Sequence, residues 1–319
     1  MNVNVEELMR RAAVRWASAA GVAPGAVDVQ AGAVLHGGTQ AALLQRFTVD
    51  AGSFRAALVL KLTWCAEFVA LSRLAPLATE LRAVPRLVDG DFLTPVTGAH
   101  PPGPLEPAWI VTPFVDGVAA SGATDLPLTL FADLADLHAS TIDVSEPPIV
   151  EITASWFAHL AGIYVTGEIA GTPGIDPGVI SELTARTRHL ARSEAIERAL
   201  RTLPRCLLHG DVHAGNVLVA DDGTAVLLDW ANARIGPMLV DLANVAEPGS
   251  AALTTYLACL EARLGQPLDR RLVDVGYWYA TVQINTQYLP WVLANHGSAA
   301  AVAMSDRAVD AEQQLRRVL

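Results

Sequence analysis

One segment of the chain constrains its fold more than any other. Residues 206–229 read CLLHGDVHAGNVLVADDGTAVLLD, in which the apolar runs NVLVA and AVLLD flank a turn at Asp221, Asp222 and Gly223. This pattern predicts a β-hairpin. Polar residues gather in the loop that precedes the hairpin, and a polar loop tethered between apolar strands is a candidate functional site.

Three side chains of this segment carry oxygen atoms suited to a metal ion. Asp211 and Asn216 lie five residues apart in the loop, and Asp229 ends the second strand of the hairpin, which can return it to the neighbourhood of the loop. Carboxylate and amide oxygens are the hard ligands that Mg²⁺ prefers, and Mg²⁺ usually completes its shell with waters and substrate phosphates. The segment therefore predicts nucleotide phosphate chemistry.

The chain has 319 residues, which at roughly 150 residues per domain allows two domains or one two-lobed fold. Its pattern changes after Gly117, from strands with one packed helix to a run of helices. We therefore expect an α+β fold with a β-rich lobe over 1–117 and a mostly helical lobe over 118–319. The expected elements are a helix over 5–20, strands within 27–62, a helix over 66–82, strands near 84–94 and 108–115, and helices over 127–140, 152–165, 178–201, 250–264, 270–295 and 299–317.

Composition excludes several classes of protein. The net charge is −11, and residues 118–319 carry 23 acids and 13 bases, whereas nucleic-acid binding needs clustered positive charge. No stretch approaches the 18 or so apolar residues of a membrane-spanning helix. The N-terminus reads as an amphipathic helix rather than a signal peptide, so a cytoplasmic location is expected. Three widely spaced cysteines indicate neither a disulfide framework nor a zinc site.

Lys61 is the only lysine among 22 basic residues, and the other 21 are arginines. A chain that uses arginine almost everywhere retains one compact ammonium, which differs in shape and hydration from a planar guanidinium. Lys61 is therefore a candidate for a site that requires a point charge. Chance survival of an exposed lysine is the alternative.

The order His209-Gly210-Asp211, Asn216 and Asp229-Trp230 resembles the aminoglycoside phosphotransferases and related small-molecule kinases, which share the protein-kinase fold. Further matches occur in order along almost the whole chain. They are Gly37 and Gly38 in a strand-turn-strand, Lys61 on a strand, Glu67 in a helix, Leu137-His138, and Gly236 with Asp241-Leu242-Ala243. The resemblance implies a bilobal fold whose first lobe binds the nucleotide and whose second lobe holds the catalytic loop and the acceptor.

The resemblance implies a role for each matching polar residue. Asp211 would accept or orient the proton of the acceptor hydroxyl, and Asn216 and Asp229 would hold Mg²⁺ against the phosphates of ATP or GTP. Lys61 would contact the α- and β-phosphates. His213, two residues after Asp211, stands where protein kinases place a lysine near the transferred phosphate, so a catalytic role is open beside one in loop packing.

Other positions complete the implied nucleotide site. Glu67 would pair with Lys61, although only six residues separate them, and Glu80 is the alternative partner. The glycines Gly37 and Gly38 would let the backbone approach the phosphates, or form an ordinary tight turn. The segment WIVTPFVDG resembles the interlobe hinge, with Thr112 as gatekeeper. Adenine would then use the carbonyl of Pro113 and the N–H of Val115.

The acceptor and the reaction leave alternatives open. The charge of the second lobe favours a small, hydroxylated and cationic acceptor such as an amino-sugar antibiotic, although an acidic surface also serves solubility. Trp278, Asn285 and Tyr288 recur at helical spacing and could line a sugar-binding face, or form part of the core. A metabolic kinase for a sugar, choline or homoserine is an alternative function. A nucleotide-binding pseudokinase and a metal-dependent hydrolase are more remote ones, and the sequence leaves the oligomeric state undetermined.

Overall fold

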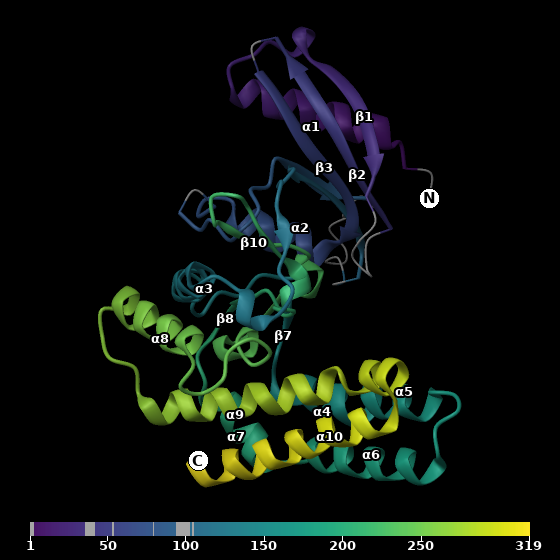
Figure 1. Ribbon diagram of the computed structural model, residues 1–319, viewed down its shortest axis with the longest axis vertical. Coiled ribbons are helices and arrows are strands. Elements are labelled where there is room, and N and C mark those ends of the chain that lie inside the picture. Colours follow the sequence, from purple (N-terminus) through teal and green to yellow (C-terminus); the bar gives the residue numbers. More distant parts are fainter. Residues whose placement is uncertain (1–2, 36–41, 53, 79, 94–102, 104) are drawn as a thin grey trace. The chain divides into compact units, whose positions relative to one another are not determined.

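A computed structural model describes residues 3–35, 42–52, 54–78, 80–93, 103 and 105–319 (Figure 1). Gly37 and Gly38 lie outside the described residues. The chain divides into two compact units, of which the first comprises residues 1–134, 145–150 and 213–233, and the second comprises 135–144, 151–212 and 234–319. Each unit thus contains three separate segments of the chain. Each unit is described by itself.

The first unit is built on a five-stranded antiparallel sheet in the order β1-β2-β3-β5-β4. Its strands are β1 (Asp28–Val34), β2 (Leu43–Ala51), β3 (Phe54–Trp64), β4 (Asp89–Phe92) and β5 (Pro107–Pro113). Helix α1 (Val5–Ala19) lies along these strands in Figure 1, with Met9, Ala12 and Ala13 in their core. That core also contains Phe47, Val49, Leu58, Leu60, Trp109 and Val111.

The same unit contains helix α2 (Cys65–Leu74) and a second small sheet, in the order β10-β9-β6. Its strands are β6 (Val118–Ala119), β9 (Val217–Val219) and β10 (Ala225–Leu227). The predicted hairpin is confirmed, because Val217 pairs with Leu227 and Val219 with Ala225. Pairing of β6 with β9 joins the hairpin to strand β6 of the first unit.

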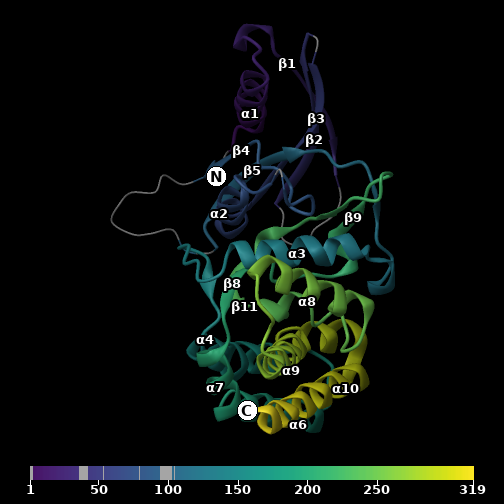
Figure 2. The same cartoon turned by 90° about the vertical axis from the view of Figure 1, so that its left-hand side faces the viewer.

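The second unit is mostly helical, with a three-stranded sheet in the order β7-β11-β8. Figure 2 shows α6, α9 and α10 close together, and buried residues of α5, α6 and α10 share one core, among them Ile169, Leu183, Leu293 and Met304. The strands are β7 (Val150–Glu151), β8 (Arg205–Leu208) and β11 (Arg234–Pro237). The helices are α4 (Ala154–His159), a π-helix (Leu160–Val165), α5 (Thr166–Gly171), α6 (Pro177–Leu190), α7 (Glu194–Thr202), α8 (Ala251–Leu264), α9 (Arg270–Gln287) and α10 (Leu289–Val318).

Short elements and one shared helix complete the fold. Helix α3 (Leu128–Ser140) contains the boundary between the units at residue 134. The 3-10 helices are Pro24–Ala26, Ala123–Asp125, Ala214–Asn216, Trp230–Asn232 and Met238–Asp241. In the part of the chain that the structure describes, no helix combines the length and apolar character needed to cross a bilayer.

Four predicted helices end differently in the structure. The helix expected over 66–82 stops at Leu74, and the helix expected over 152–165 continues to Gly171. The helix expected over 178–201 is two helices, because α6 ends at Leu190 and α7 begins at Glu194 after Ser193, whose buried hydroxyl donates to Glu312. The helix expected over 270–295 stops at Gln287. Pro290 lies in the first turn of α10, where its missing N–H costs no helical hydrogen bond.

Candidate active site

Lys61, Glu67 and Asp229 form a buried cluster of charges in the first unit. Lys61 projects from β3, and its Nζ lies 2.7 Å from Glu67 Oε2 and 2.7 Å from Asp229 Oδ1. The side chains of Lys61, Glu67 and Asp229 are 10%, 3% and 19% exposed. Two carboxylates thus face one ammonium, and the cluster as a whole carries an excess of negative charge.

Glu67 is the carboxylate that accompanies Lys61, rather than Glu80, which the sequence left open. It lies in the first turn of α2, directly after β3, and this position lets it reach back across only six residues. Thr63 donates from its hydroxyl to Glu67 Oε2 at 2.5 Å, and the N–H of Trp230 donates to Oε1 at 3.3 Å. These contacts fix the carboxylate on both sides.

The protonation of Lys61 follows from its partners. Burial disfavours the charged form, but the carboxylates of Glu67 and Asp229 more than offset this, so the pKa of Lys61 lies above its ordinary value. Lys61 is therefore a fixed ammonium at neutral pH. A permanent positive charge on a strand, held by two carboxylates, is suited to contact phosphate oxygens.

Asn216 and Asp229 come from the facing ends of the hairpin strands. The pairing of Val217 with Leu227 brings Asn216 opposite Leu228, whose N–H donates to the Asn216 carbonyl at 2.7 Å. Asp229 follows directly, and its backbone is left-handed, with φ of 63°. Only glycine adopts this region freely, so the turn holds Asp229 in a strained conformation.

The side-chain oxygen atoms of Asn216 and Asp229 are of the kind that binds a magnesium ion. Among the described residues, no group of three or more His, Cys, Asp or Glu could enclose a metal. Mg²⁺ does not need such a cage, because it is commonly held by one or two carboxylates together with waters and phosphates. Asn216 could supply an amide oxygen and Asp229 a carboxylate, and the excess of negative charge around Lys61 would favour a cation there.

Three other predicted positions belong to the first unit. His213 is exposed, and its Nδ1 accepts from the Gly215 N–H at 3.1 Å, which caps the short helix Ala214–Asn216. Pro113 ends β5, and Val115 follows it in an irregular segment, both half-buried. The N–H of Phe114, between them, donates to the Ala57 carbonyl at 2.9 Å.

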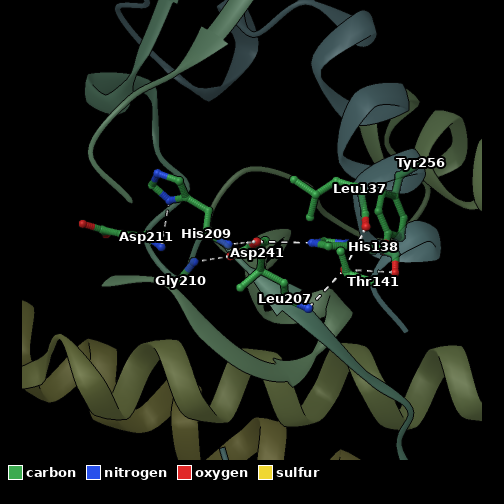
Figure 3. A network of polar contacts seen from close by, with 9 residues as sticks. All are labelled: Leu137, His138, Thr141, Leu207, His209, Gly210, Asp211, Asp241 and Tyr256. Carbon is green, nitrogen blue, oxygen red and sulfur yellow. Dashed lines mark hydrogen bonds and ion pairs between the residues drawn. The ribbon is translucent and has the colours of Figure 1, made fainter. Parts of the chain in front are cut away.

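In the second unit, Asp241 organises the loop that begins at His209. Its Oδ2 accepts from the His209 N–H at 2.7 Å, and its Oδ1 accepts from the Gly210 N–H at 2.8 Å (Figure 3). Gly210 has a φ of 81°, which side chains disfavour. The Asp211 N–H then donates to His209 Nδ1 at 3.2 Å. His209 and Asp241 thus fix the backbone from which Asp211 projects.

A further layer of buried groups supports Asp241. His138 on α3 lies between it and Tyr256 of α8, with its Nε2 at 3.3 Å from Asp241 Oδ2 and its Nδ1 at 2.8 Å from the Tyr256 hydroxyl. Figure 3 shows this chain of contacts running from Asp211 to Tyr256. His138, His209 and Asp241 are almost completely buried. Buried hydrogen bonds among His138, Tyr256 and Asp241 thus stabilise the loop that begins at His209.

Replacement of Asp241 by asparagine is expected to destabilise the protein by about 2–4 kcal/mol, because an amide NH₂ then faces one of two buried donors. Urea unfolding monitored by circular dichroism measures the change. Asp274→Asn, on the exposed side of α9, is the matched control and should change stability by no more than about 0.5 kcal/mol. Equal stability of the Asp241 variant and the control would contradict this assignment.

Asp211 itself contacts the C-terminal helices. The Tyr288 hydroxyl donates to Asp211 Oδ1 at 2.6 Å. Arg234 of β11 lies near both side chains, and its guanidinium lies over the Trp156 ring, 5.2 Å from the ring centroid. The sequence offered one signal for Arg234, a charged residue between the apolar Ala233 and Ile235, but its part in this cluster was not predicted.

The other two predicted acceptor residues occupy different surroundings. Asn285 is buried on α9, donates to the Thr281 carbonyl at 2.8 Å and accepts from Arg307 Nε at 3.1 Å. Trp278 is half-buried and packs edge-on against Tyr277, with 5.4 Å between ring centroids. Of the three aromatic and amide residues predicted for the acceptor, Tyr288 is the one that contacts Asp211.

Comparisons with known proteins show the family of this chain. The model of the phosphotransferase enzyme family matches residues 65–272, about two thirds of the chain, and the chain therefore belongs to this family. It is an enzyme of the phosphotransferase class. No curated protein matches its sequence.

Solved structures share the fold at low sequence identity. The aminoglycoside phosphotransferase of Alicyclobacillus acidocaldarius is 15% identical, with a TM-score of 0.54, and the match covers 93% of this chain and 95% of that one. A choline/ethanolamine kinase family protein of Mesorhizobium loti is 16% identical, with a TM-score of 0.53 and coverage of 90% and 92%. A thermostable mutant of aminoglycoside phosphotransferase APH(4)-Ia, crystallised with ADP and hygromycin B, is 16% identical, with a TM-score of 0.52 and coverage of 91% and 95%. The expected α+β, protein-kinase-like fold is confirmed.

Proposed function

We propose that this protein transfers the γ-phosphoryl group of ATP or GTP to a hydroxyl of a small molecule, such as an aminoglycoside-like antibiotic or another amino sugar. The observation that carries the proposal is the buried cluster of Lys61, Glu67 and Asp229. The ammonium of Lys61 is suited to bind the phosphates of a nucleotide, and the carboxylate of Asp229, which follows the hairpin, is suited to bind their metal ion. Membership of the phosphotransferase family supports the same conclusion.

On the nucleotide side, Lys61 would contact the α- and β-phosphates while Glu67 fixes its direction. Asn216 and Asp229 would hold Mg²⁺, which when bound neutralises charge on the phosphate oxygens. The Pro113 carbonyl and the Val115 N–H would bind the purine.

On the acceptor side, Asp211 would orient the acceptor hydroxyl and take its proton. The hydroxyl oxygen forms a bond to the γ-phosphorus as the bond from that phosphorus to the β,γ-bridging oxygen breaks, and the nucleoside diphosphate leaves. Because the reaction depends on positioning, the fixed backbone at His209 and Gly210 supports this role for Asp211. His213, close along the chain, is a second candidate for contact with the transferred group.

The acceptor class is inferred from charge. Residues 118–319 carry a net charge of −10, which favours a cationic or polyhydroxylated acceptor. One structural neighbour was crystallised with ADP and hygromycin B, and another is described as a choline/ethanolamine kinase family protein. A metabolic kinase for choline, a sugar or homoserine is the alternative within the same chemistry.

A panel assay tests the proposal. ADP release with Mg-ATP is measured alone and with hygromycin B, spectinomycin, kanamycin, glucosamine, choline or homoserine. Stimulation by an aminoglycoside or amino sugar supports the proposed acceptor class, and stimulation by choline or homoserine supports the metabolic alternative. If no compound stimulates release and nucleotide still binds, the pseudokinase alternative gains support.

Replacement of Asn216 by alanine is expected to raise the Mg²⁺ concentration for half-maximal activity by about tenfold or more, because one oxygen ligand of a hard cation is lost. The measurement is a Mg²⁺ titration of ADP release at fixed ATP. Activity of the variant should recover at high Mg²⁺. Asn244→Ala, outside the hairpin, serves as the control, and an unchanged Mg²⁺ requirement in Asn216→Ala would remove Asn216 from the metal site.

A further inference from the structure

The contact between Tyr288 and Asp211 joins the proposed catalytic carboxylate to the C-terminal helices. The Tyr288 hydroxyl lies 2.6 Å from Asp211 Oδ1, within the second unit. A hydrogen bond to an ionised carboxylate is shorter and stronger than one between neutral groups. The orientation of the Asp211 side chain is therefore coupled to the position of Tyr288.

Tyr288 is itself held in place by its surroundings. It lies at the junction of α9 and α10, where its N–H donates to the Ile284 carbonyl, and Pro290 restricts the first turn of α10. Its side chain packs against the buried core formed by α5, α6 and α10, which includes Leu289 and Leu293. The phenol is a rigid support for a carboxylate on a neighbouring loop.

The electrostatic surroundings of Tyr288 keep its hydroxyl protonated, so that it acts as a hydrogen-bond donor to Asp211. Burial, together with the negative charge of Asp211, raises the pKa of Tyr288 well above its ordinary value, so the hydroxyl keeps its proton. Arg234 provides the compensating positive charge, and burial lowers its pKa from the ordinary value. Within the described residues, Arg234 Nε is buried without a hydrogen-bond partner, so the guanidinium acts here through its charge and its stacking on Trp156.

We propose that Tyr288 is a positioning residue for the phosphoryl transfer, which acts by holding the Asp211 carboxylate toward the acceptor hydroxyl. This inference rests on the proposed function and deepens it. It differs from the role predicted from helical spacing, in which Tyr288 would contact the acceptor directly. In the proposed role, the hydroxyl of Tyr288 bonds to Asp211, and the acceptor's affinity does not depend on it.

The two roles give different kinetics. Loss of a positioning contact lowers kcat and leaves the acceptor KM nearly unchanged, whereas loss of an acceptor contact raises KM. Tyr288→Phe removes only the hydroxyl. We expect a decrease in kcat of about 10- to 100-fold, since misplacement of a catalytic group by about 1 Å can cost on the order of 10² in rate. The acceptor KM and the nucleotide KM are expected to change by less than about threefold.

Tyr279→Phe is the matched control. Tyr279 lies on α9, is completely buried, and donates from its hydroxyl to Gln283 Oε1 at 2.7 Å. This variant also loses one buried hydroxyl, but its hydrogen bond does not involve Asp211. Its kcat is expected to match the wild type, which separates the effect on Asp211 from a general loss of packing.

A double-mutant cycle with Asp211→Asn tests whether Tyr288 acts through Asp211. Kinetics are measured with the panel compound that most stimulates ADP release by the wild type. In the Asp211→Asn background, Tyr288→Phe is expected to lower kcat by less than twofold, because the group it positions is already lost. A full additional decrease in the double variant would overturn the proposal, as would an increase in acceptor KM at unchanged kcat.

Stability provides a readout that needs no substrate. In thermal melts, Tyr288→Phe is expected to lower Tm more in the wild-type background than in the Asp211→Asn background, because the bond to a charged acceptor exists only in the former. If Tyr288→Phe lowers Tm equally in both backgrounds, the hydrogen bond between Tyr288 and Asp211 does not contribute as proposed. Absence of any wild-type turnover would overturn the proposed function and the role together, whereas wild-type turnover with an unaffected Tyr288→Phe variant would overturn the role alone.

Discussion

Replacement of Asp211 by asparagine is expected to lower kcat by about 10²- to 10⁴-fold, the range attributed to general-base and positioning contributions. Asparagine has nearly the same shape and can still accept the hydrogen bond from Tyr288, but it cannot take a proton from the acceptor. Nucleotide affinity should stay close to the wild-type value, and the variant should still fold. Steady-state kinetics with an acceptor that stimulates ADP release gives kcat, and calorimetric titration gives nucleotide affinity.

Asp136→Asn is a suitable control for this substitution, since its carboxylate is partly exposed on α3 and lies near Arg263. It should leave kcat unchanged. If Asp211→Asn keeps more than about a tenth of the wild-type kcat, Asp211 is not the proton acceptor, because general-base contributions are larger than this.

Replacement of Lys61 by arginine is expected to lower kcat/KM by about 10²-fold or more, even though the positive charge is kept. The ammonium lies within 2.7 Å of both Glu67 Oε2 and Asp229 Oδ1, in a buried space that a wider, planar guanidinium does not fit. The larger group displaces either a carboxylate or the nucleotide. Steady-state kinetics with varied ATP measures the effect, and a thermal melt confirms folding.

Arg55→Lys, the reverse exchange at an exposed position of the same strand, controls for the change of side chain. Its kinetics and Tm should match the wild type. Wild-type kinetics in Lys61→Arg would instead mean that the single lysine has no part in the reaction, and that its contacts with Glu67 and Asp229 serve only the fold.

Sequence reasoning predicted those parts of the fold that depend on local patterns. The antiparallel strands, the hairpin around Asp222 and the helical second half follow from alternation, turn residues and helical spacing. The break between α6 and α7 was missed, because it coincides with a contact between Ser193 and Glu312, 119 residues further along the chain. Local periodicity carries no information about such a partner.

The candidate site likewise has residues that the sequence predicted and a contact that it did not predict. Lys61, Glu67 and Asp229 match the family pattern in their order along the chain, so all three could be predicted from the sequence, although the short spacing of Lys61 and Glu67 left Glu80 as an alternative. The contact of Tyr288 with Asp211 spans 77 residues and depends on how the junction of two helices packs, which spacing along one helix cannot supply. The sequence predicted that Tyr288 contacts the acceptor, and only the structure shows its hydrogen bond to the Asp211 carboxylate.

The environment of Lys61 also decides how the protein responds to amine-directed chemistry. Lys61 is the single side-chain amine in the sequence, and its raised pKa and its burial between two carboxylates protect it from general acylating reagents. Under the proposed function, a nucleotide that carries an acyl phosphate would deliver its electrophile to this nitrogen. Mass spectrometry of one peptide would then count occupied nucleotide sites in a mixture, before any acceptor is known.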